Sequence, residues 1–327
     1  MTSRALLSVR GLRVAFPTPA GLATVLTGVD LDVAAAEVVG LVGESGCGKS
    51  VTALAVLRLL RAPGRIAGGT VRFEGRDLLP LPEAEMRRVR GAKIGMIFQA
   101  PRESLNPVLT IGRQLGLVLD RHDGLRGAAA RARAEELCAM VELPDPGRVL
   151  RAYPHELSGG MCQRAMIALA LACRPALLIA DEATTALDVT VQLQILLLLR
   201  RLRETLGLAQ LLITHNLGVV AEACDRVAVM YAGEIVEAAA ADDLFAAPRH
   251  PYTSRLLAAR PRIGRPPDGD PIPGSVPDPL ARPAGCPFHP RCPRADGRCR
   301  DAHPPMVEEG PGHALRCFHP EPVEASR

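Results

Sequence analysis

One stretch of the sequence constrains the fold more than any other: VVGLVGESGCGKSVTALAVLRLL at 38–60. Its pattern predicts an apolar strand, a glycine-rich turn and an amphipathic helix, in that order. The turn fits GxxxxGK[ST], in which backbone N–H groups wrap phosphate oxygens, the lysine reaches the β and γ oxygens, and the hydroxyl binds Mg²⁺. A glycine turn that merely preceded a helix would need no lysine. The predicted phosphate-binding residues are Gly43, Glu44, Ser45, Gly46, Cys47, Gly48, Lys49, Ser50 and Val51.

Lysine is rare in this chain, which makes Lys49 conspicuous. Only Lys49 and Lys93 are lysines among the 39 basic residues, and the net charge of +4 is too small to indicate a nucleic-acid or membrane surface. Arg10 and Arg13 interrupt what would be the apolar core of a signal peptide. The apolar stretches are shorter than the ~18 to 20 residues of a membrane span. We therefore expect a cytosolic protein whose membrane contacts go through a partner.

Two adjacent carboxylates end the apolar stretch LLIADE at 177–182. A buried strand of a P-loop sheet would deliver them to a nucleotide-bound metal. Asp181 would then hold Mg²⁺ through water, and Glu182 would act as general base toward the attacking water. The same pair could instead be a solvated strand cap, so this motif alone does not decide between the two.

A third motif, LSGGM at 157–161, decides the question when it is taken with the order of the other two. Together the three closely resemble the ABC ATPase superfamily. Ser158, Gly159 and Gly160 would open a helix whose free N–H groups point at an anion. In that superfamily the anion is the γ-phosphate of ATP held by the opposite subunit. The resemblance therefore implies two ATP sites that form only in a dimer.

The resemblance covers residues 6 to about 260 and implies roles for four more residues. Phe16 would stack on adenine, although a core phenylalanine is the alternative. Gln99 in MIFQAP would contact Mg²⁺ or water at the Q-loop, beside the transmembrane partner. His215 in ITHN would touch the γ-phosphate, and Asp188 in ATTALD would link the two sites across the dimer.

The predicted fold is α/β, a P-loop NTPase of the ABC type. Residues 6–39 predict antiparallel strands, the later alternation of strands and helices predicts a mostly parallel core sheet, and RVAVMYAGEIVE predicts a hairpin around Ala232-Gly233. We expect one ATPase domain over 1–260, with a helical subdomain at about 100–165. A proline-rich linker and a small irregular, cysteine-rich extension would follow at 261–327.

Longer phrases narrow the resemblance to one transporter group. SLNPVLTIG, YPHELSGGMCQR, TTALDVTVQ and HPYTSRLL, together with GCPFHPRCPRA at 285–295, resemble the D-type ATPase of bacterial dipeptide/oligopeptide importers. The resemblance implies a peripheral ATPase at the cytoplasmic face of the membrane, docked on two permease subunits through the region 99–106. A second ABC ATPase, identical or a related sister, and an extracytoplasmic solute-binding protein would complete the assembly, and no nucleic acid is expected.

Three positions depart from the family pattern. Cys162 stands where Ser is common, Ala183 where Pro follows the catalytic Glu, and Asn216 where Asp follows the switch His. None of the three removes a catalytic group, but loss of the proline would loosen the D-loop approach.

Four of the nine cysteines cluster near the C-terminus with the spacing C-x5-C-x6-C-x17-C: Cys286, Cys292, Cys299 and Cys317. Their segment is rich in proline and has little apolar material to bury, so it needs a staple. Disulfides are not expected in a reducing cytosol. Four thiolates suit zinc or a [4Fe-4S] cluster, and free thiols are the third possibility. The family resemblance favours a [4Fe-4S] cluster in a structural role.

Other functions fit part of the pattern. Soluble ABC ATPases that act on DNA or ribosomes carry long coiled coils or two ATPase sets per chain, whereas this chain predicts one set and a short insertion. A metal-responsive regulator would need a switching feature, for which no sequence feature argues. Uptake of nickel or antimicrobial peptides stays open, because the ATPase does not touch the cargo.

Overall fold

The computed structural model describes residues 5–183, 188–259 and 272–322. These residues form two compact units. The first, here called the P-loop unit, takes the described residues of 1–33, 38–79 and 214–327. The second, here called the helical unit, takes those of 34–37 and 80–213. The P-loop unit is therefore assembled from segments that lie far apart in the sequence.

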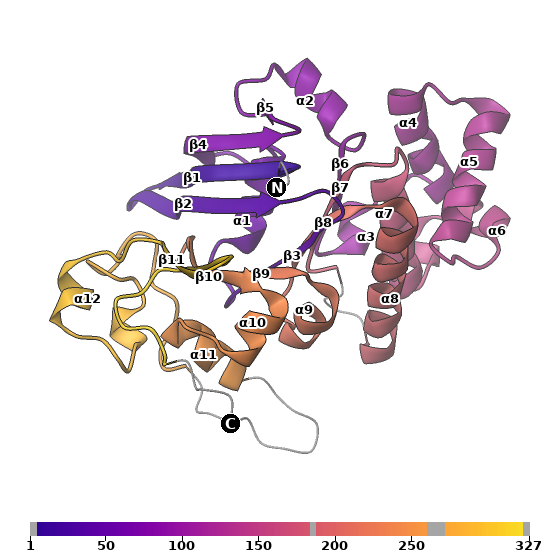
Figure 1. The fold of residues 1–327 in the computed structure, drawn as a ribbon. Helices are drawn as coiled ribbons and strands as arrows, with labels where there is room; N and C mark the ends of the chain where they lie inside the picture. Colours follow the sequence, from indigo (N-terminus) through magenta and orange to yellow (C-terminus); the bar gives the residue numbers. More distant parts are fainter. Residues whose placement is uncertain (1–4, 184–187, 260–271, 323–327) are drawn as a thin grey trace. The chain divides into compact units, whose positions relative to one another are not determined.

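An antiparallel sheet begins the P-loop unit, with the strand order β2-β1-β4-β5 (Figure 1). Leu12 and Val14 of β1 are fully buried while Arg13 between them is exposed, the alternation of a strand with one face on a core. The predicted antiparallel β portion is thus confirmed. The strands are β1 (Leu7–Thr18), β2 (Gly21–Val33), β4 (Arg65–Phe73) and β5 (Arg76–Asp77).

A second sheet of the same unit leads into the P-loop. Its strands follow the order β11-β12-β10-β9-β3, and β3 runs parallel to β9. Every residue of β3 is buried, as expected for a central parallel strand. The strands are β3 (Val38–Val42), β9 (Arg226–Tyr231), β10 (Glu234–Ala240), β11 (Val307–Gly310) and β12 (His313–Leu315). The helices are α1 (Lys49–Val56), α9 (Leu217–Ala223), α10 (Ala241–Ala246), α11 (Pro251–Ala258) and α12 (Gly297–Asp301), with the 3₁₀ turn η2 (His289–Arg291).

The predicted hairpin between β9 and β10 is confirmed, and its tip touches two other elements. Ala232 and Gly233 have φ of 44° and 82°, the left-handed conformation that a two-residue hairpin turn requires. The Gly233 N–H donates to the carbonyl of Cys47 at 2.8 Å, and the Gly233 carbonyl accepts from the N–H of Thr27 at 3.0 Å. The hairpin tip therefore bridges the P-loop and β2.

The C-terminal extension is irregular apart from η2, α12 and the two short strands β11 and β12. β12 pairs antiparallel with β10, so the extension lengthens the sheet that carries the P-loop. The predicted boundary between residues 260 and 261 lies outside the described residues, and the predicted domain limits remain predictions.

Buried carboxylates of β10 attach to histidines of the extension. The Nε2 atoms of His303 and His313 lie 2.8 Å from carboxylate oxygens of Glu234 and Glu237, respectively. Burial acts to raise the pKa of Glu237, but hydrogen bonds, foremost with His313, outweigh it and lower that pKa. Glu237 is therefore an ionised side chain that helps to hold β12 in place.

Three parallel strands organise the helical unit, in the order β8-β7-β6. Both β7 and β8 are buried at every residue, so they read as apolar runs in the sequence. The strands are β6 (Ile94–Ile97), β7 (Leu177–Asp181) and β8 (Ala209–Ile213). The helices are α2 (Glu83–Val89), α3 (Pro101–Ser104), α4 (Ile111–Asp123), α5 (Gly127–Met140), α6 (Pro146–Arg151), α7 (Gly159–Leu171) and α8 (Val189–Leu206), with the 3₁₀ turn η1 (Pro154–Glu156).

The helices α4 to α7 form a layer of their own within this unit (Figure 1). Thr110 caps α4 by accepting from the N–H of Arg113 at 3.2 Å, and Gly124 ends the helix in the left-handed conformation. After α5, Glu142 accepts from Arg164 of α7 at 2.7 Å and also pairs with Arg201 of α8. This shared carboxylate fastens the end of α5 to two neighbouring helices.

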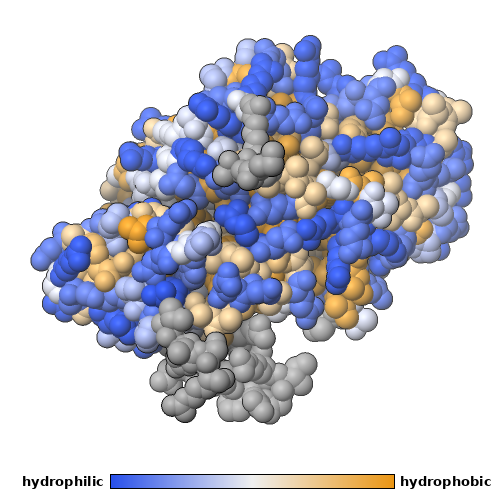
Figure 2. Space-filling view, in the orientation of Figure 1, coloured by the Kyte–Doolittle hydropathy of each residue, from blue (hydrophilic) through white to orange (hydrophobic). Residues whose placement is uncertain are grey.

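The surface of the described chain mixes polar and apolar side chains. On the face that Figure 2 shows, hydrophobic residues lie interspersed with hydrophilic ones. No helix within residues 5–183, 188–259 and 272–322 has both the length and the apolar composition of a membrane span.

The hairpin tip provides a test of the P-loop unit. A Cβ added at Gly233 would lie 2.0 Å from the carbonyl oxygen of Val25, so Gly233→Ala must displace backbone. We expect a loss of about 2 kcal/mol or more in the free energy of unfolding, measured by thermal denaturation. Gly116→Ala in α4 is the matched control, because its Cβ would meet open space, and it should be neutral or stabilising by about 0.5–1 kcal/mol. Equal melting temperatures for the two variants would contradict this account of the tip.

Candidate nucleotide site and cysteine cavity

The P-loop lies so close to neighbouring elements that two of its positions exclude any side chain. Gly43 has φ of 153°, and a Cβ there would lie 2.2 Å from the carbonyl oxygen of Met230 in β9. Gly48 has φ of 114°, and its Cβ would lie 2.7 Å from the side chain of Leu26. Gly48 also begins α1 without a side-chain cap. A helix start without a side-chain cap suits the binding of an anion.

Lys49 is held across the loop that it belongs to. Its side chain is buried, with 6% of the residue exposed, and Nζ donates to the carbonyls of Gly43 at 2.8 Å and Glu44 at 2.9 Å. Carbonyl oxygens orient an ammonium but carry no net charge, so its full positive charge remains to attract phosphate. Burial raises the pKa of the neighbouring Cys47 thiol, which keeps that side chain neutral.

The remaining predicted residues of the P-loop unit lie in this turn, in the first turn of α1 and on β1. Ser45 and Gly46 are exposed at the tip of the P-loop, and Ser50 and Val51 are half-buried in the first turn of α1. Phe16 is half-buried on β1. A Cβ added at Gly64 would come within 2.4 Å of its ring, so the ring packs on that glycine.

In the helical unit, the structure brings Gln99 and Glu182 together. They follow the neighbouring parallel strands β6 and β7, where Ile97 pairs with Ala180. The side-chain amide of Gln99 donates to Oε2 of Glu182 at 2.6 Å, and the Glu182 N–H donates to the carbonyl of Ile213 at 2.9 Å. Glu182 has φ of 46°, a strained conformation for a non-glycine residue and one that often marks functional positions.

Asp181 is the last residue of β7 and is 5% exposed. Buried carboxylates are expected to be paired or to bind a metal, so this burial argues against a solvated strand cap. Asp181 and Glu182 lie in the helical unit, whereas Lys49 and Ser50 lie in the P-loop unit.

The LSGGM motif begins a helix, as the sequence predicts. Ser158 is the N-cap of α7, and its Oγ accepts from the N–H of Met161 at 3.3 Å. Gly159 and Gly160 are the first two residues of the helix, and a Cβ at Gly160 would meet Val191 of α8 at 3.0 Å. There is therefore little room for a side chain at Gly160.

Cys162 lies in the buried interior next to the first turn of α7. It is fully buried, and its thiol lies 3.3 Å from the carbonyl of Pro154, in the geometry of a weak hydrogen bond. Arg102 of α3 donates to the carbonyl of Leu157 at 3.1 Å, which ties the segment after Gln99 to the start of the motif. The first departure from the family pattern is thus accommodated by packing.

The predicted residues Asp188 and His215 both lie at or beside the start of a helix. Asp188 caps α8, with Oδ1 accepting from the N–H of Val191 at 2.9 Å, while residues 184–187 of the same motif lie outside the described chain. His215 is exposed in the segment before α9. Asn216 caps α9, accepting from the N–H of Gly218 at 3.0 Å. Asn216 therefore supplies the capping oxygen that an aspartate would supply there.

All four C-terminal cysteines line one small cavity in the P-loop unit. None of them is in a disulfide. Burial raises the pKa of Cys286 to about 11 and that of Cys317 to about 12, and the nearby thiols add to both shifts. The four side chains thus converge as neutral thiols that a soft metal would deprotonate.

A closer group of possible ligands surrounds one of these cysteines. Asp296, Cys299 and His319 have ligand atoms within 4.8 Å of one another, and no other such group of three or more exists among the described residues. The Oδ1 atom of Asp296 also accepts from the N–H of Cys299 at 3.0 Å. The four cysteine sulfur atoms are therefore spaced more widely than this trio.

Comparison with known proteins identifies the family to which this chain belongs. Residues 26–185 match the model of the ABC transporter family, and residues 236–299 match that of the oligopeptide/dipeptide transporter C-terminal region. A "Probable peptide ABC transporter ATP-binding protein" of Sinorhizobium fredii is 52% identical over 321 residues, which cover 97% of this chain and 96% of that protein. The chain belongs to the family of ABC transporter ATP-binding proteins.

Two further similarities support the assignment of this ABC ATPase. The oligopeptide transport ATP-binding protein OppD of Escherichia coli is 49% identical over 97% of the chain and 94% of its own length. A solved dimeric ATP-binding cassette in a post-hydrolysis state, bound to ADP and Pi, aligns with a TM-score of 0.65 and 29% identity. The alignment covers 72% of this chain and 98% of the cassette. The predicted α/β P-loop fold of the ABC type is confirmed.

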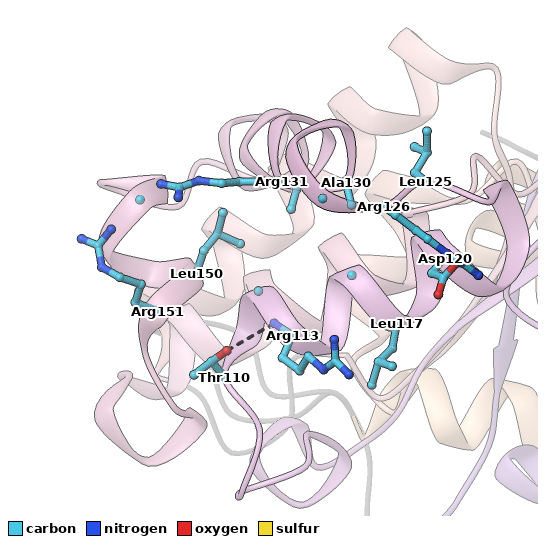
Figure 3. A pocket seen from close by; sticks show the side chains of 15 residues that line it. Thr110, Arg113, Leu117, Asp120, Leu125, Arg126, Ala130, Arg131, Leu150 and Arg151 are labelled. Atoms are coloured by element: carbon cyan, nitrogen blue, oxygen red, sulfur yellow. Dashed lines mark hydrogen bonds and ion pairs between the residues drawn. The ribbon is translucent and has the colours of Figure 1, made fainter.

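The ABC ATPase also has a groove that holds none of the predicted site residues. It lies among α4, α5 and α6 and is lined by Arg113, Arg126, Arg131 and Arg151. Figure 3 shows Arg131 and Arg151 at one end and the 2.6 Å pair of Arg126 with Asp120 at the other. This groove is basic, and no residue of the P-loop, the LSGGM motif or the cysteine cavity lines it.

Sequence reasoning missed a contact of the P-loop in this ABC ATPase. Arg291, beside Cys292, donates to both carboxylate oxygens of Glu44 in the P-loop, at 2.6 and 2.9 Å. The two residues are 247 positions apart, and no local pattern links them. The cap at Asn216, in contrast, had a sequence signal, because asparagine before a short apolar run is a preferred N-cap.

The cap predicts how the ABC ATPase responds to substitution at Asn216. Asn216→Ala removes the oxygen that accepts from the α9 backbone and should lower the free energy of unfolding by about 1 kcal/mol. Asn216→Asp keeps that oxygen and adds a negative charge at a helix N-terminus, so its melting temperature should equal or exceed the wild type. Thermal denaturation of the three proteins checks this, and equal losses in both variants would exclude the capping role.

Proposed function

We propose that this ABC ATPase is the ATP-hydrolysing subunit of a bacterial importer of di- and oligopeptides. The observation that carries the proposal is that similarity to peptide-transport ATP-binding proteins extends over 97% of the chain and includes the oligopeptide/dipeptide C-terminal region. Binding and hydrolysis of ATP in this subunit drive uptake through separate membrane subunits. The chain's own residues handle the nucleotide and never meet the peptide.

The P-loop unit binds the nucleotide. Phe16 stacks on adenine, the backbone N–H groups of 43–51 wrap the phosphates, and Lys49 pairs with the β and γ oxygens. Ser50, Asp181 and Gln99 would hold Mg²⁺, which neutralises charge on the phosphates when bound. The burial of Lys49 and the glycine requirement at Gly43 and Gly48 support this assignment.

Glu182 is the general base of hydrolysis. It takes a proton from the attacking water as the water oxygen bonds to the γ-phosphorus and the bond to the β–γ bridging oxygen breaks, which releases ADP and phosphate. The 2.6 Å hydrogen bond from Gln99 supports the role, since it orients the carboxylate of Glu182. His215 contacts the γ-phosphate.

Hydrolysis takes place in a dimer. Ser158, Gly159 and Gly160 of each subunit contact the γ-phosphate of ATP on the other subunit, and Asp188 links the two sites. The exposure of Ser158 at the start of α7 supports this contact. The second ATPase is an identical chain or a related one.

The ATPase pair docks on two permease subunits at the cytoplasmic face of the membrane, and an extracytoplasmic solute-binding protein delivers the peptide. The segment around Gln99 to Asn106 contacts the permease. Phe98 and Val108, on either side of it, are 36% and 75% exposed. Apolar side chains that flank a polar loop in this way support its use as a protein interface.

The four C-terminal cysteines hold a [4Fe-4S] cluster that staples the extension. Four thiolates around one zinc would lie about 3.8 Å apart, since each Zn–S bond is about 2.3 Å. The described chain places no three of these sulfur atoms within 4.8 Å of one another, and this wider spacing supports the larger cluster. Soft thiolate ligands are the donors that iron–sulfur clusters use, and nothing in the chain assigns the cluster an electron-transfer role.

Substitution of Glu182 tests the catalytic proposal. Glu182→Gln should bind Mg-ATP with near wild-type affinity but hydrolyse it at least about 100-fold more slowly, because the amide cannot accept the proton from water. Steady-state turnover of the chain with its permease and sister ATPase measures this. Glu136→Gln, an exposed carboxylate of α5, is the control and should keep full turnover.

Two outcomes would overturn the proposed function. Near-normal hydrolysis by Glu182→Gln would remove Glu182 from the role of base. Wild-type turnover that is indifferent to the permease, or that rises with nucleic acid, would place the chain among soluble ABC ATPases instead.

The cysteine cavity predicts the metal content of the purified chain. Anaerobically purified wild type should contain about four iron atoms and four acid-labile sulfides per chain, with the visible absorption of a [4Fe-4S] cluster. Cys317→Ser should lose both, whereas Cys173→Ser, in the helical unit and remote from the cavity in sequence, should keep them. Stoichiometric zinc in place of iron would contradict the cluster.

A further inference from the structure

We propose that Arg291 is a positioning residue of the nucleotide site: through Glu44 it fixes the P-loop turn in the shape that receives phosphate. The inference rests on the proposed ATP-binding role of that turn. It makes the C-terminal extension, which is remote from the P-loop in sequence, a structural part of the nucleotide site.

The contact between the two residues is a bidentate ion pair. One guanidinium nitrogen of Arg291 donates to Oε2 of Glu44 at 2.6 Å, and the other donates to Oε1 at 2.9 Å. Only 7% of Arg291 is exposed, so solvent screens this pair far less than it screens a surface pair. The parallel arrangement fixes direction as well as distance, which lysine could not do.

The extension and the hairpin strand β9 hold Arg291 in place. Its Nε donates to the carbonyl of Pro273 at 2.7 Å, and a terminal nitrogen donates to the hydroxyl of Tyr231 at 3.3 Å. The guanidinium carbon also lies 5.7 Å from the centre of the Tyr231 ring. Arg291 therefore cannot follow Glu44 if the P-loop moves, and it acts as a fixed point.

Glu44 passes this constraint to the phosphate-binding atoms. Its N–H donates to the hydroxyl of Tyr252 at 2.8 Å, and its carbonyl accepts from Nζ of Lys49 at 2.9 Å. The side chain, N–H and carbonyl of Glu44 are thus all engaged. Rotation of this one residue would move the carbonyl that orients Lys49.

Aromatic packing closes the same junction. The rings of Tyr231, Tyr252 and Phe288 lie 4.7 to 5.4 Å from one another, centroid to centroid, in tilted or edge-on contact. Phe288 belongs to the extension and is 1% exposed. The extension therefore contributes both a buried aromatic side chain, Phe288, and a charged one, Arg291, to the surroundings of the P-loop.

A merely structural ion pair would predict a different response to substitution. Loss of such a pair lowers stability and the amount of folded protein, but the protein that folds binds ATP normally. A positioning role predicts a higher KM for ATP with little change in kcat, because Glu182 and Gln99 lie in the other unit and keep their contact.

The test compares Arg291→Gln, Arg291→Lys, Glu44→Gln and the double variant Arg291→Gln/Glu44→Gln with wild type, each as the full chain in its transporter complex. The readouts are kcat, KM for Mg-ATP and melting temperature. Arg291→Gln and Glu44→Gln should each raise KM about tenfold, with kcat within about threefold. Arg291→Lys should recover part of the loss, and the double variant should be no worse than either single one.

Arg294→Gln is the matched control. Arg294 lies three positions further along the same segment and pairs with Glu321 at 3.1 Å rather than with the P-loop, so its KM should equal the wild type. Glu44→Gln leaves the buried guanidinium of Arg291 unpaired, which can prevent folding. Arg291→Gln, which leaves only the partly exposed Glu44 unpaired, and the double variant, which leaves both partners neutral, keep the test decisive in that case.

The proposal would be overturned if the KM for Mg-ATP stayed within twofold of wild type in those of Arg291→Gln, Glu44→Gln and the double variant that fold. It would also be overturned if the KM increases of Arg291→Gln and Glu44→Gln multiplied in the double variant. Either result leaves the proposed function standing as long as Glu182→Gln abolishes turnover. Absence of Mg-ATP hydrolysis by wild type would instead refute the proposed function itself.

Discussion

The contact between the P-loop and the tip of the β9–β10 hairpin sets the geometry around it. Gly43 lies against the carbonyl of Met230, and the carbonyl of Cys47 accepts from Gly233. These contacts involve backbone atoms and leave no room for movement, so the turn after β3 can adopt only one conformation. The burial of Lys49, the uncapped start of α1 and the place of Glu44 beside Tyr252 all follow from that conformation.

Short motifs predicted the parts of the molecule whose function resides in a few consecutive residues. The GxxxxGKS turn, the cap at Ser158 and the carboxylates at the end of β7 each depend on local backbone conformation, and a window of ten residues contains that information. The buried parallel strands were recognisable for the same reason, since a central strand is apolar at nearly every position. Family resemblance then added roles for Phe16 and His215 that local chemistry alone does not decide.

Contacts between distant segments were beyond prediction. The attachment of Glu237 to His313, the pairing of β12 with β10 and the clamp of Arg291 on Glu44 each join residues more than 70 positions apart. Arginine is so common in this chain that nothing marks position 291 among the others. A buried partner is fixed by three-dimensional packing, which a single sequence does not display.

The discontinuous make-up of the P-loop unit has a consequence for synthesis on the ribosome. The helical unit, apart from 34–37, is one continuous stretch at 80–213, and its contacts become available as soon as that stretch has emerged. The phosphate-binding turn is translated early, but β9, β12 and Arg291, which complete its surroundings, are translated more than 170 residues later. The nascent chain must therefore carry an unfinished glycine-rich turn through most of its translation.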